Sequence, residues 1–164
     1  TALIRQLIDA VKKEPVQPWN GKKVVLSGIM AEPDEFLDIF SEFNIAVVAD
    51  DLAQESRQFR TDVPSGIDPL EQLAQQWQDF DGCPLALNPD KPRGQMLIDM
   101  TKKYKADAVV VCMMRFCDPE EFDYPIYKPE FEEAGVRYTV LDLDIESPSL
   151  EQLRTRIQAF SEIL

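Results

Sequence analysis

The chain has 164 residues, of which 45% are hydrophobic and 29% charged, a composition typical of one globular domain with a substantial core. Its 30 acidic residues outnumber 17 basic ones, and the formal charge of −13 argues against a nucleic-acid or anionic-membrane partner. No apolar run approaches the roughly 20 residues of a membrane span. The first residues lack the basic start and long apolar centre of a signal peptide, and we expect a cytoplasmic protein. Because the sequence also lacks an initial Met, we expect a fragment or a processed product.

Two features of the composition narrow the chemistry. The chain contains no histidine, which removes the commonest general base and every Ser/His or Cys/His catalytic pair within it. Its three cysteines are too few for a four-thiolate metal site, and their odd number does not indicate a disulfide framework. Any chemistry of this domain therefore depends on thiols, carboxylates, backbone groups or a bound cofactor.

Residues 1–21 predict a helical preface followed by a linker. Apolar side chains recur with helical spacing over residues 2–13, and the prolines at positions 15 and 18 then break the chain. From residue 22 onward, short apolar strands alternate with amphipathic helices. We expect strands at 24–26, 45–49, 108–112 and 138–143, and helices that start at Asp34 and Pro69, cover 93–104 and 126–134, and follow Ser149.

This alternation predicts an α/β fold over residues 22–164. The expected architecture is a doubly wound, mostly parallel sheet of about four strands with helices on both faces, in the flavodoxin-like strand order 2-1-3-4. In that order strands 1 and 3 are neighbours, so the loops at 27–33 and 112–124 face each other across one crevice. Open α/β sheets bind ligands at this carboxyl edge, which makes the two loops the candidate site.

The sequence CMMRFCDPEE, residues 112–121, places Cys117 just past the third strand. The Asp-Pro that follows indicates a turn rather than a helix, so the sulfur is expected to face outward. From the residues alone, Cys117 is either a ligand or reactive thiol, or an inert loop cysteine. Cys112 is expected to be a buried strand residue, with metal ligation as the alternative, and Cys83 beside a proline is expected to be inert.

Polar residues near the same edge are candidates for contact with substrate. Ser27 precedes a glycine and is placed to offer backbone N–H groups to an anion, although a plain tight turn is the alternative. Arg57, Arg60 and Arg115 stand out in an acidic chain, and each either binds a carboxylate or phosphate or lies on a solvated face. Four acidic residues after the third strand resemble a metal cluster, but a solvated loop is expected; they are Asp118, Glu120, Glu121 and Asp123.

The stretch CMMRFCDPEEFDYP, residues 112–125, resembles the signature of the D component of 2-hydroxyacyl-CoA dehydratases. DLAQESRQF at 51–59 and KPRG at 91–94 are similar to other recurring stretches of that family. The resemblance runs from Lys22 to the C-terminus. It is greatest to beta subunits of 2-hydroxyglutaryl-CoA dehydratase, and benzoyl-CoA reductase subunits are related.

The resemblance implies a heterodimeric, cytoplasmic enzyme of anaerobic amino acid fermentation, in which an alpha subunit is the partner. Each subunit of the family carries a [4Fe-4S] cluster held by three of its own cysteines, two of them from more N-terminal domains. The third cysteine lies in the Phe-Cys-Asp-Pro context, which here is Cys117. A separate ATP-hydrolysing iron–sulfur activator injects one electron, the substrate thioester becomes a ketyl radical anion, and the 2-hydroxyl group is eliminated. (R)-2-hydroxyglutaryl-CoA is thereby converted to glutaconyl-CoA.

The regions that would carry the other two cluster cysteines are missing from this chain. We therefore expect a domain that contributes one ligand, holds no cluster firmly and has no activity of its own. The resemblance does not identify a general base. The alternative, from a different class, is a stand-alone flavodoxin-like binding or interaction domain without a cluster.

Overall fold

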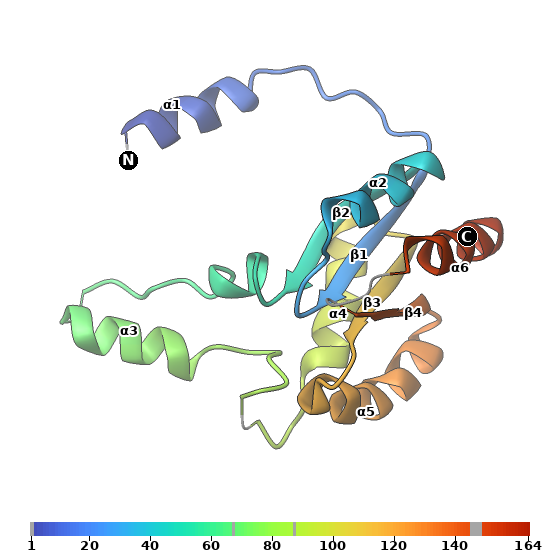
Figure 1. The fold of residues 1–164 in the computed structure, drawn as a ribbon. Helices are drawn as coiled ribbons and strands as arrows, with labels where there is room; N and C mark the ends of the chain where they lie inside the picture. The colour runs from blue at the N-terminus through green and yellow to red at the C-terminus, as the bar shows by residue number, and fades with distance from the viewer. Residues whose placement is uncertain (1, 67, 87, 145–148) are drawn as a thin grey trace.

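The computed structural model describes residues 2–66, 68–86, 88–144 and 149–164. Six helices, one short 3₁₀ helix and four strands follow one another along these residues (Figure 1). In chain order they are α1 (Ala2–Val11), β1 (Lys22–Gly28), α2 (Asp34–Glu42), β2 (Ile45–Leu52), η1 (Ser56–Gln58), α3 (Pro69–Gln78), α4 (Arg93–Tyr104), β3 (Ala108–Met114), α5 (Asp118–Ala134), β4 (Arg137–Leu143) and α6 (Leu150–Ile163).

The four strands form one parallel sheet in the order β2-β1-β3-β4, which confirms the predicted fold class and strand order. Successive strands are connected through helices, as parallel pairing requires. The interiors of β1 and β3 are buried, which explains their continuous runs of Val and Leu. Because the strands are parallel, their carboxyl ends meet at one edge of the sheet (Figure 1).

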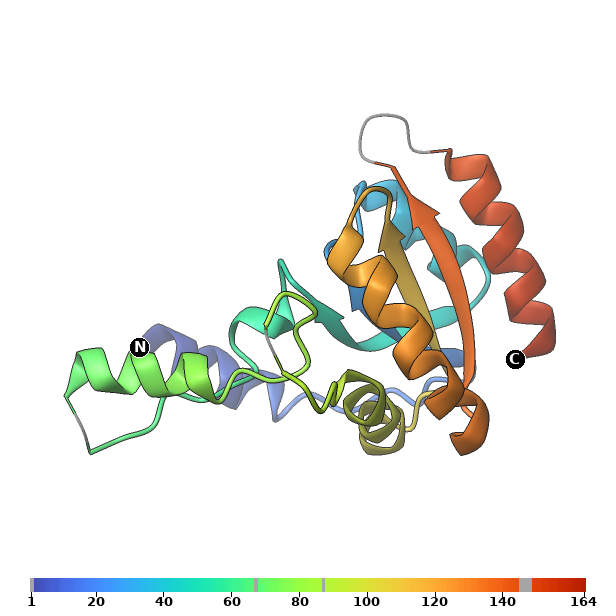
Figure 2. The same cartoon turned by 90° about the horizontal axis from the view of Figure 1, so that it is seen from below.

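Helices cover both faces of the sheet, also as predicted (Figure 2). On one face, Leu26 and Val110 pack with buried side chains of α2 and α6. On the other face, Val109 and Val111 pack with α4 and α5. The carboxyl edge is therefore held between two apolar layers.

Helix α5 begins earlier than the sequence indicated. We expected a turn after Cys117 and a helix from residue 126, but α5 starts at Asp118 and Cys117 is its N-cap residue. A proline in the first helical turn costs little, because the N–H group that it lacks has no intrahelical partner there. The helix also continues through Pro125 and Pro129. The Asp-Pro pair is therefore the start of a helix rather than a break.

Helices α1 and α3 stand apart from the sheet-and-helix body in both views (Figures 1 and 2). Neither helix contains a buried residue, and α1 ends at Val11, two residues before the predicted end. Helix α3 starts as expected, with the Asp68 carboxylate accepting a hydrogen bond from the Leu70 N–H at 2.9 Å. Within the described residues, no helix has the length and hydropathy needed to cross a bilayer.

Candidate functional site

The carboxyl edge of the sheet brings together residues that are far apart in the sequence. Ser27 at the end of β1 is paired in register with Asp51 of β2, and Gly28 is paired with Cys112 of β3. Gly28 has a φ of 153°, and a Cβ at this position would overlap the backbone carbonyl oxygen of Cys112. Only glycine suits this close approach of β1 to β3, so Gly28 has a clear backbone role.

Beneath this edge lies a set of charged and polar side chains that we call the buried ionic network. Each of its five members has at most 2% of its surface exposed. They are Ser27, Asp51, Arg57, Arg93 and Glu120. Burial of charges is costly unless they are paired and hydrogen-bonded, so their contacts decide whether the arrangement is stable.

Asp51 is at the centre of the network and has no exposed surface. Its carboxylate accepts hydrogen bonds from Nε and Nη2 of Arg57 at 3.2 and 3.1 Å, and from Nη1 of Arg60 at 2.5 Å. Nε of Arg93 lies 3.3 Å from Oδ2 of Asp51, and the Ser27 hydroxyl donates to the same oxygen at 3.2 Å. Three guanidinium groups therefore share one buried carboxylate.

Glu120 in the first turn of α5 is the second carboxylate of the network. Its Oε2 accepts a hydrogen bond from Nη1 of Arg93 at 2.5 Å, and its Oε1 lies 3.5 Å from Nη2 of Arg57. Desolvation of Arg93 works against its charge, but the carboxylates of Glu120 and Asp51 more than offset it and hold the pKa of Arg93 above its ordinary value. Arg93 therefore stays protonated.

The acidic residues after β3 divide into two groups, and the expectation of a solvated loop is wrong for half of them. Glu120 and Asp123 are buried, whereas Asp118 and Glu121 are exposed. Asp123 lies 3.2 Å from Nζ of Lys91. Glu120 and Asp123 are three positions apart, so they lie on the same face of α5, the face that packs against the domain. The described residues contain no group of three or more His, Cys, Asp or Glu side chains placed to hold a metal ion.

Cys117 is partly exposed at the carboxyl edge, where the sequence placed it. Its N–H donates to the Met114 carbonyl at 3.2 Å, and its own carbonyl accepts from the Glu121 N–H at 3.0 Å. Its side chain makes no capping hydrogen bond, so the thiol is available to a ligand. Phe116 beside it has a φ of 65° and is 92% exposed. The thiol of the N-cap residue of α5 is therefore partly exposed and without a capping bond.

The other two cysteines are in different surroundings. Cys112 is fully buried in β3, and burial, with a smaller contribution from the charge of Glu120, raises the pKa of its thiol to about 12. Its placement agrees with the expected buried strand residue. Cys83 is partly buried in a hollow of about 580 Å³ that Arg57, Trp77 and Phe80 also line.

The four predicted substrate contacts have distinct environments. Ser27 donates to Asp51 and accepts a hydrogen bond from Nη2 of Arg93 at 2.9 Å. Arg57 is buried, so the alternative of a solvated helix face is wrong for it. Arg60 is partly buried against Asp51.

Arg115 is the fourth of these residues, and it is exposed. Its Nη1 lies 3.4 Å from Oδ2 of Asp144, so it is the candidate whose surroundings match a solvated face.

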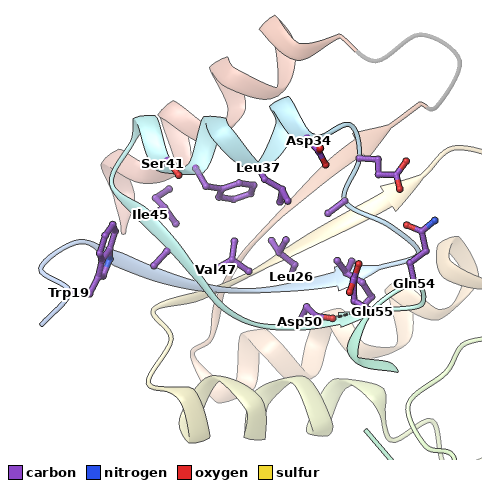
Figure 3. A pocket seen from close by; sticks show the side chains of 15 residues that line it. Trp19, Leu26, Asp34, Leu37, Ser41, Ile45, Val47, Asp50, Gln54 and Glu55 are labelled. Carbon is purple, nitrogen blue, oxygen red and sulfur yellow. Dashed lines mark hydrogen bonds between the residues drawn. The ribbon is translucent and has the colours of Figure 1, made fainter. Parts of the chain in front are cut away.

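A separate hollow of about 570 Å³ lies between α2 and the edge strand β2 (Figure 3). Leu26 and Val47 contribute apolar surface, whereas Asp34, Asp50 and Glu55 bring carboxylates to its margin (Figure 3). These carboxylates would repel the phosphate groups of a coenzyme A thioester. The hollow is therefore a poor match for such a ligand.

Sequence reasoning missed the role of Arg93 and the burial of Glu120. The available signals were an aspartate at the end of an apolar strand and an arginine that opens an amphipathic helix. Neither signal identifies the partner, because Arg93 and Glu120 are 27 residues apart and Arg57 and Glu120 are 63 apart. Only the fold brings them into contact.

Taken together, the fold and the site define a class: a doubly wound α/β domain that presents a partly exposed thiol over a buried ionic network at its carboxyl edge. Residues 1–164 match the family described as 2-hydroxyglutaryl-CoA dehydratase, D-component, and the chain belongs to that family. The resemblance stated from the Cys117 stretch is confirmed.

Three curated relatives are similar over the whole chain. It is 56% identical to the lactoyl-CoA dehydratase subunit beta of Anaerotignum propionicum and 44% identical to the (R)-phenyllactyl-CoA dehydratase beta subunit of Clostridium sporogenes. It is 30% identical to the (R)-2-hydroxyglutaryl-CoA dehydratase subunit beta of Acidaminococcus fermentans. The chain spans 44% of the length of each of these relatives.

Proposed function

We propose that this chain is a C-terminal domain of the beta subunit of an (R)-2-hydroxyacyl-CoA dehydratase, a hydro-lyase that removes water from its thioester substrate. The observation that carries the proposal is the family match over residues 1–164, supported by beta subunits of three dehydratases among the relatives. In this proposal residues 1–21 are a helical preface and linker, and residues 22–164 are the α/β domain. The partners are an alpha subunit and an ATP-dependent iron–sulfur activator.

Cys117 is the residue that we propose as ligand to a [4Fe-4S] cluster. Its thiol is partly exposed, makes no capping bond and lies at the edge where doubly wound sheets bind cofactors. Buried Cys112, with its raised pKa, is a poorer ligand because a thiol must be deprotonated to bind metal. A bound cluster would supply the single-electron chemistry that makes elimination of a poorly activated 2-hydroxyl group feasible.

One thiolate is too few to hold a cluster firmly, so the other ligands must come from outside the described residues. We therefore propose that the 164-residue chain by itself is inactive and retains no cluster. Its free cysteines suit a reducing compartment such as the cytoplasm. Anaerobic reconstitution of the isolated chain to a stable [4Fe-4S] absorption spectrum would contradict this part of the proposal.

The substrate is an (R)-2-hydroxyacyl-CoA, and two arguments bear on its acyl group. The motif resemblance points to 2-hydroxyglutaryl-CoA, whose product is glutaconyl-CoA. The identity to the lactoyl-CoA relative is higher, however, at 56% against 30%. We therefore expect kcat/KM to be greatest with lactoyl-CoA when the complete enzyme is given lactoyl-CoA, phenyllactyl-CoA and 2-hydroxyglutaryl-CoA in parallel.

Arg57, Arg60, Arg115 and Ser27 stay proposed contacts for the thioester, and their surroundings rank them. Arg60 and Arg115 have exposed surface to offer, whereas the donors of Arg57 already face protein acceptors. Replacing Arg60 or Arg115 with Ala in the complete enzyme should raise KM for the thioester. An unchanged KM in both variants would remove them from the substrate site.

The decisive experiment measures iron and acid-labile sulfide in the complete beta subunit under anaerobic conditions. Cys117→Ala should lose the cluster, whereas Cys83→Ala and Cys112→Ala serve as matched controls and should keep it. Cluster content that is unchanged in Cys117→Ala would refute the assignment of the ligand. Absence of iron from the wild-type subunit would favour the alternative of a binding or interaction domain without a cluster.

A further inference from the structure

Two residues at the start of α5 differ in their exposure to solvent. Cys117 at the N-cap is partly exposed, whereas Glu120, three residues later, has no exposed surface. The carboxylate of Glu120 accepts a 2.5 Å hydrogen bond from Nη1 of Arg93. The turn that presents the thiol is therefore attached to the interior of the domain through Glu120.

The two arginines that contact Glu120 are themselves held at the ends of strands. Nη2 of Arg57 donates to the backbone carbonyls of Gly28 and Asp51 at 2.9 and 2.8 Å. Nη2 of Arg93 donates to the Ser27 hydroxyl at 2.9 Å. Glu120 is thus linked through two planar, multiply bonded cations to the last residues of β1 and β2.

The side chain of Cys117 makes no capping hydrogen bond that would orient the thiol. The backbone of Cys117 is held by its N–H, which donates to the Met114 carbonyl, and by its carbonyl, which accepts from the Glu121 N–H. A buried ion pair is also seldom the most stable choice, because apolar side chains of similar volume often serve stability as well or better. A role of these charges other than stability is therefore compatible with their burial.

We propose that Arg93 and Glu120 are positioning residues, which fix the start of α5 so that the Cys117 thiol points in the direction a metal cluster requires. The inference rests on the proposed role of Cys117 as a cluster ligand. Residues behind a metal ligand commonly orient it, and their replacement costs about 10- to 100-fold in metal affinity. The cluster would then bind to a thiol whose direction is set before the metal arrives.

The network offers a variant that separates positioning from stability. Arg93→Met with Glu120→Met removes one positive and one negative charge. Asp51 keeps Arg57 and Arg60 as partners, and Asp123 keeps Lys91. No buried charge is left alone, so the double variant is expected to melt near the wild-type temperature while the first turn of α5 loses its attachment.

The test uses the complete beta subunit, reconstituted anaerobically, with two measurements that do not depend on turnover. The first is the rate of iron release to a ferrous chelator such as ferrozine, and the second is the electron paramagnetic resonance spectrum of the reduced cluster. We expect about 10- to 100-fold faster release and altered g values in Glu120→Gln and in the Arg93→Met/Glu120→Met double variant. Arg93→Lys keeps the charge but loses the planar fork, so its release rate should be intermediate.

The control is Leu153→Ala, a core substitution in α6 on the opposite face of the sheet. It destabilises the domain without touching the network and should keep the wild-type g values and release rate. Wild-type release rates and spectra in the network variants would overturn the inference. If the double variant does not fold, Arg93→Lys carries the test, and a wild-type spectrum and rate in that variant would overturn the inference equally.

Cys117→Ala, measured in parallel, separates failure of the inference from failure of the proposed function. If Cys117→Ala keeps its full iron content, the ligand assignment falls and the inference falls with it. If Cys117→Ala loses iron while the network variants behave as wild type, the ligand assignment stands and only the positioning role is refuted.

Discussion

Replacing Asp51 with Asn is the sharpest test of the buried ionic network. The substitution keeps the shape of the side chain but removes the charge that Arg57, Arg60 and Arg93 share. Two of these guanidinium groups are 2% exposed and would keep Glu120 as their main carboxylate partner. Breaking a buried ionic contact by removing one partner typically costs about 3–5 kcal/mol. For a chain of this length, that loss lowers the melting temperature by roughly 9–15 °C.

The measurement is a thermal melt of the wild type and the variant at pH 7, followed by circular dichroism. Asp99→Asn is the matched control, because Asp99 makes the same kind of contact with Lys102 at 3.5 Å but is 63% exposed. An exposed pair contributes about 0–1 kcal/mol, so the control should melt within a few degrees of the wild type. A similar, small shift in both variants would refute the conclusion that the charges around Asp51 are desolvated.

The other predictions concern packing and the buried thiol. Gly94→Ala should lose about 1–3 kcal/mol in a urea titration, because a Cβ there would overlap the Cβ of Tyr127, which cannot move aside as the end of the Glu130 side chain can. Gly135→Ala, with open space but a φ of 66°, should lose about 1–2 kcal/mol. Iodoacetamide at pH 8, read out by peptide mass spectrometry, should modify Cys117 and spare Cys112. Burial raises the pKa of the Cys112 thiol to about 12, so the unfolded chain loses this proton at lower pH than the folded chain does. Cys112 therefore lowers the free energy of unfolding above pH 9 by up to about 1.4 kcal/mol per pH unit, and Cys112→Ala should show a correspondingly smaller decline. Equal modification of Cys117 and Cys112 by iodoacetamide would contradict the burial of Cys112.

The fold could be predicted from the sequence because its two central strands, β1 and β3, are buried on both faces. The runs Val24-Val25-Leu26 and Val109-Val110-Val111 show no alternation, and amphipathic helices follow them, which together indicate a covered parallel sheet. The start of α5 could not be predicted in the same way. A local rule on residues before proline favoured a turn, but contacts of Glu120 and Tyr127 with the body of the domain outweigh that preference.

The candidate site was predictable only in part, for a related reason. The position of Cys117 follows from the end of a strand, which a sequence pattern reveals. The burial of Arg57 depends instead on carboxylates at positions 51 and 120, and charged residues are rarely buried without such partners. Long-range pairing of charges leaves no periodic signal in one sequence.

The groups paired around the buried ionic network have a different balance of charge from the whole chain. The chain carries a formal charge of −13, yet the ion pairs described around Asp51, Glu120 and Asp123 involve four cations against these three carboxylates. The electric field inside a poorly solvated region depends far more on the nearby charged groups than on distant surface charges, which the solvent screens. The exposed carboxylates of Asp118 and Glu121, in the first turn of α5, offset this excess on the solvent side. The formal charge of the whole chain therefore says little about the electric field at this edge, which the nearby groups determine.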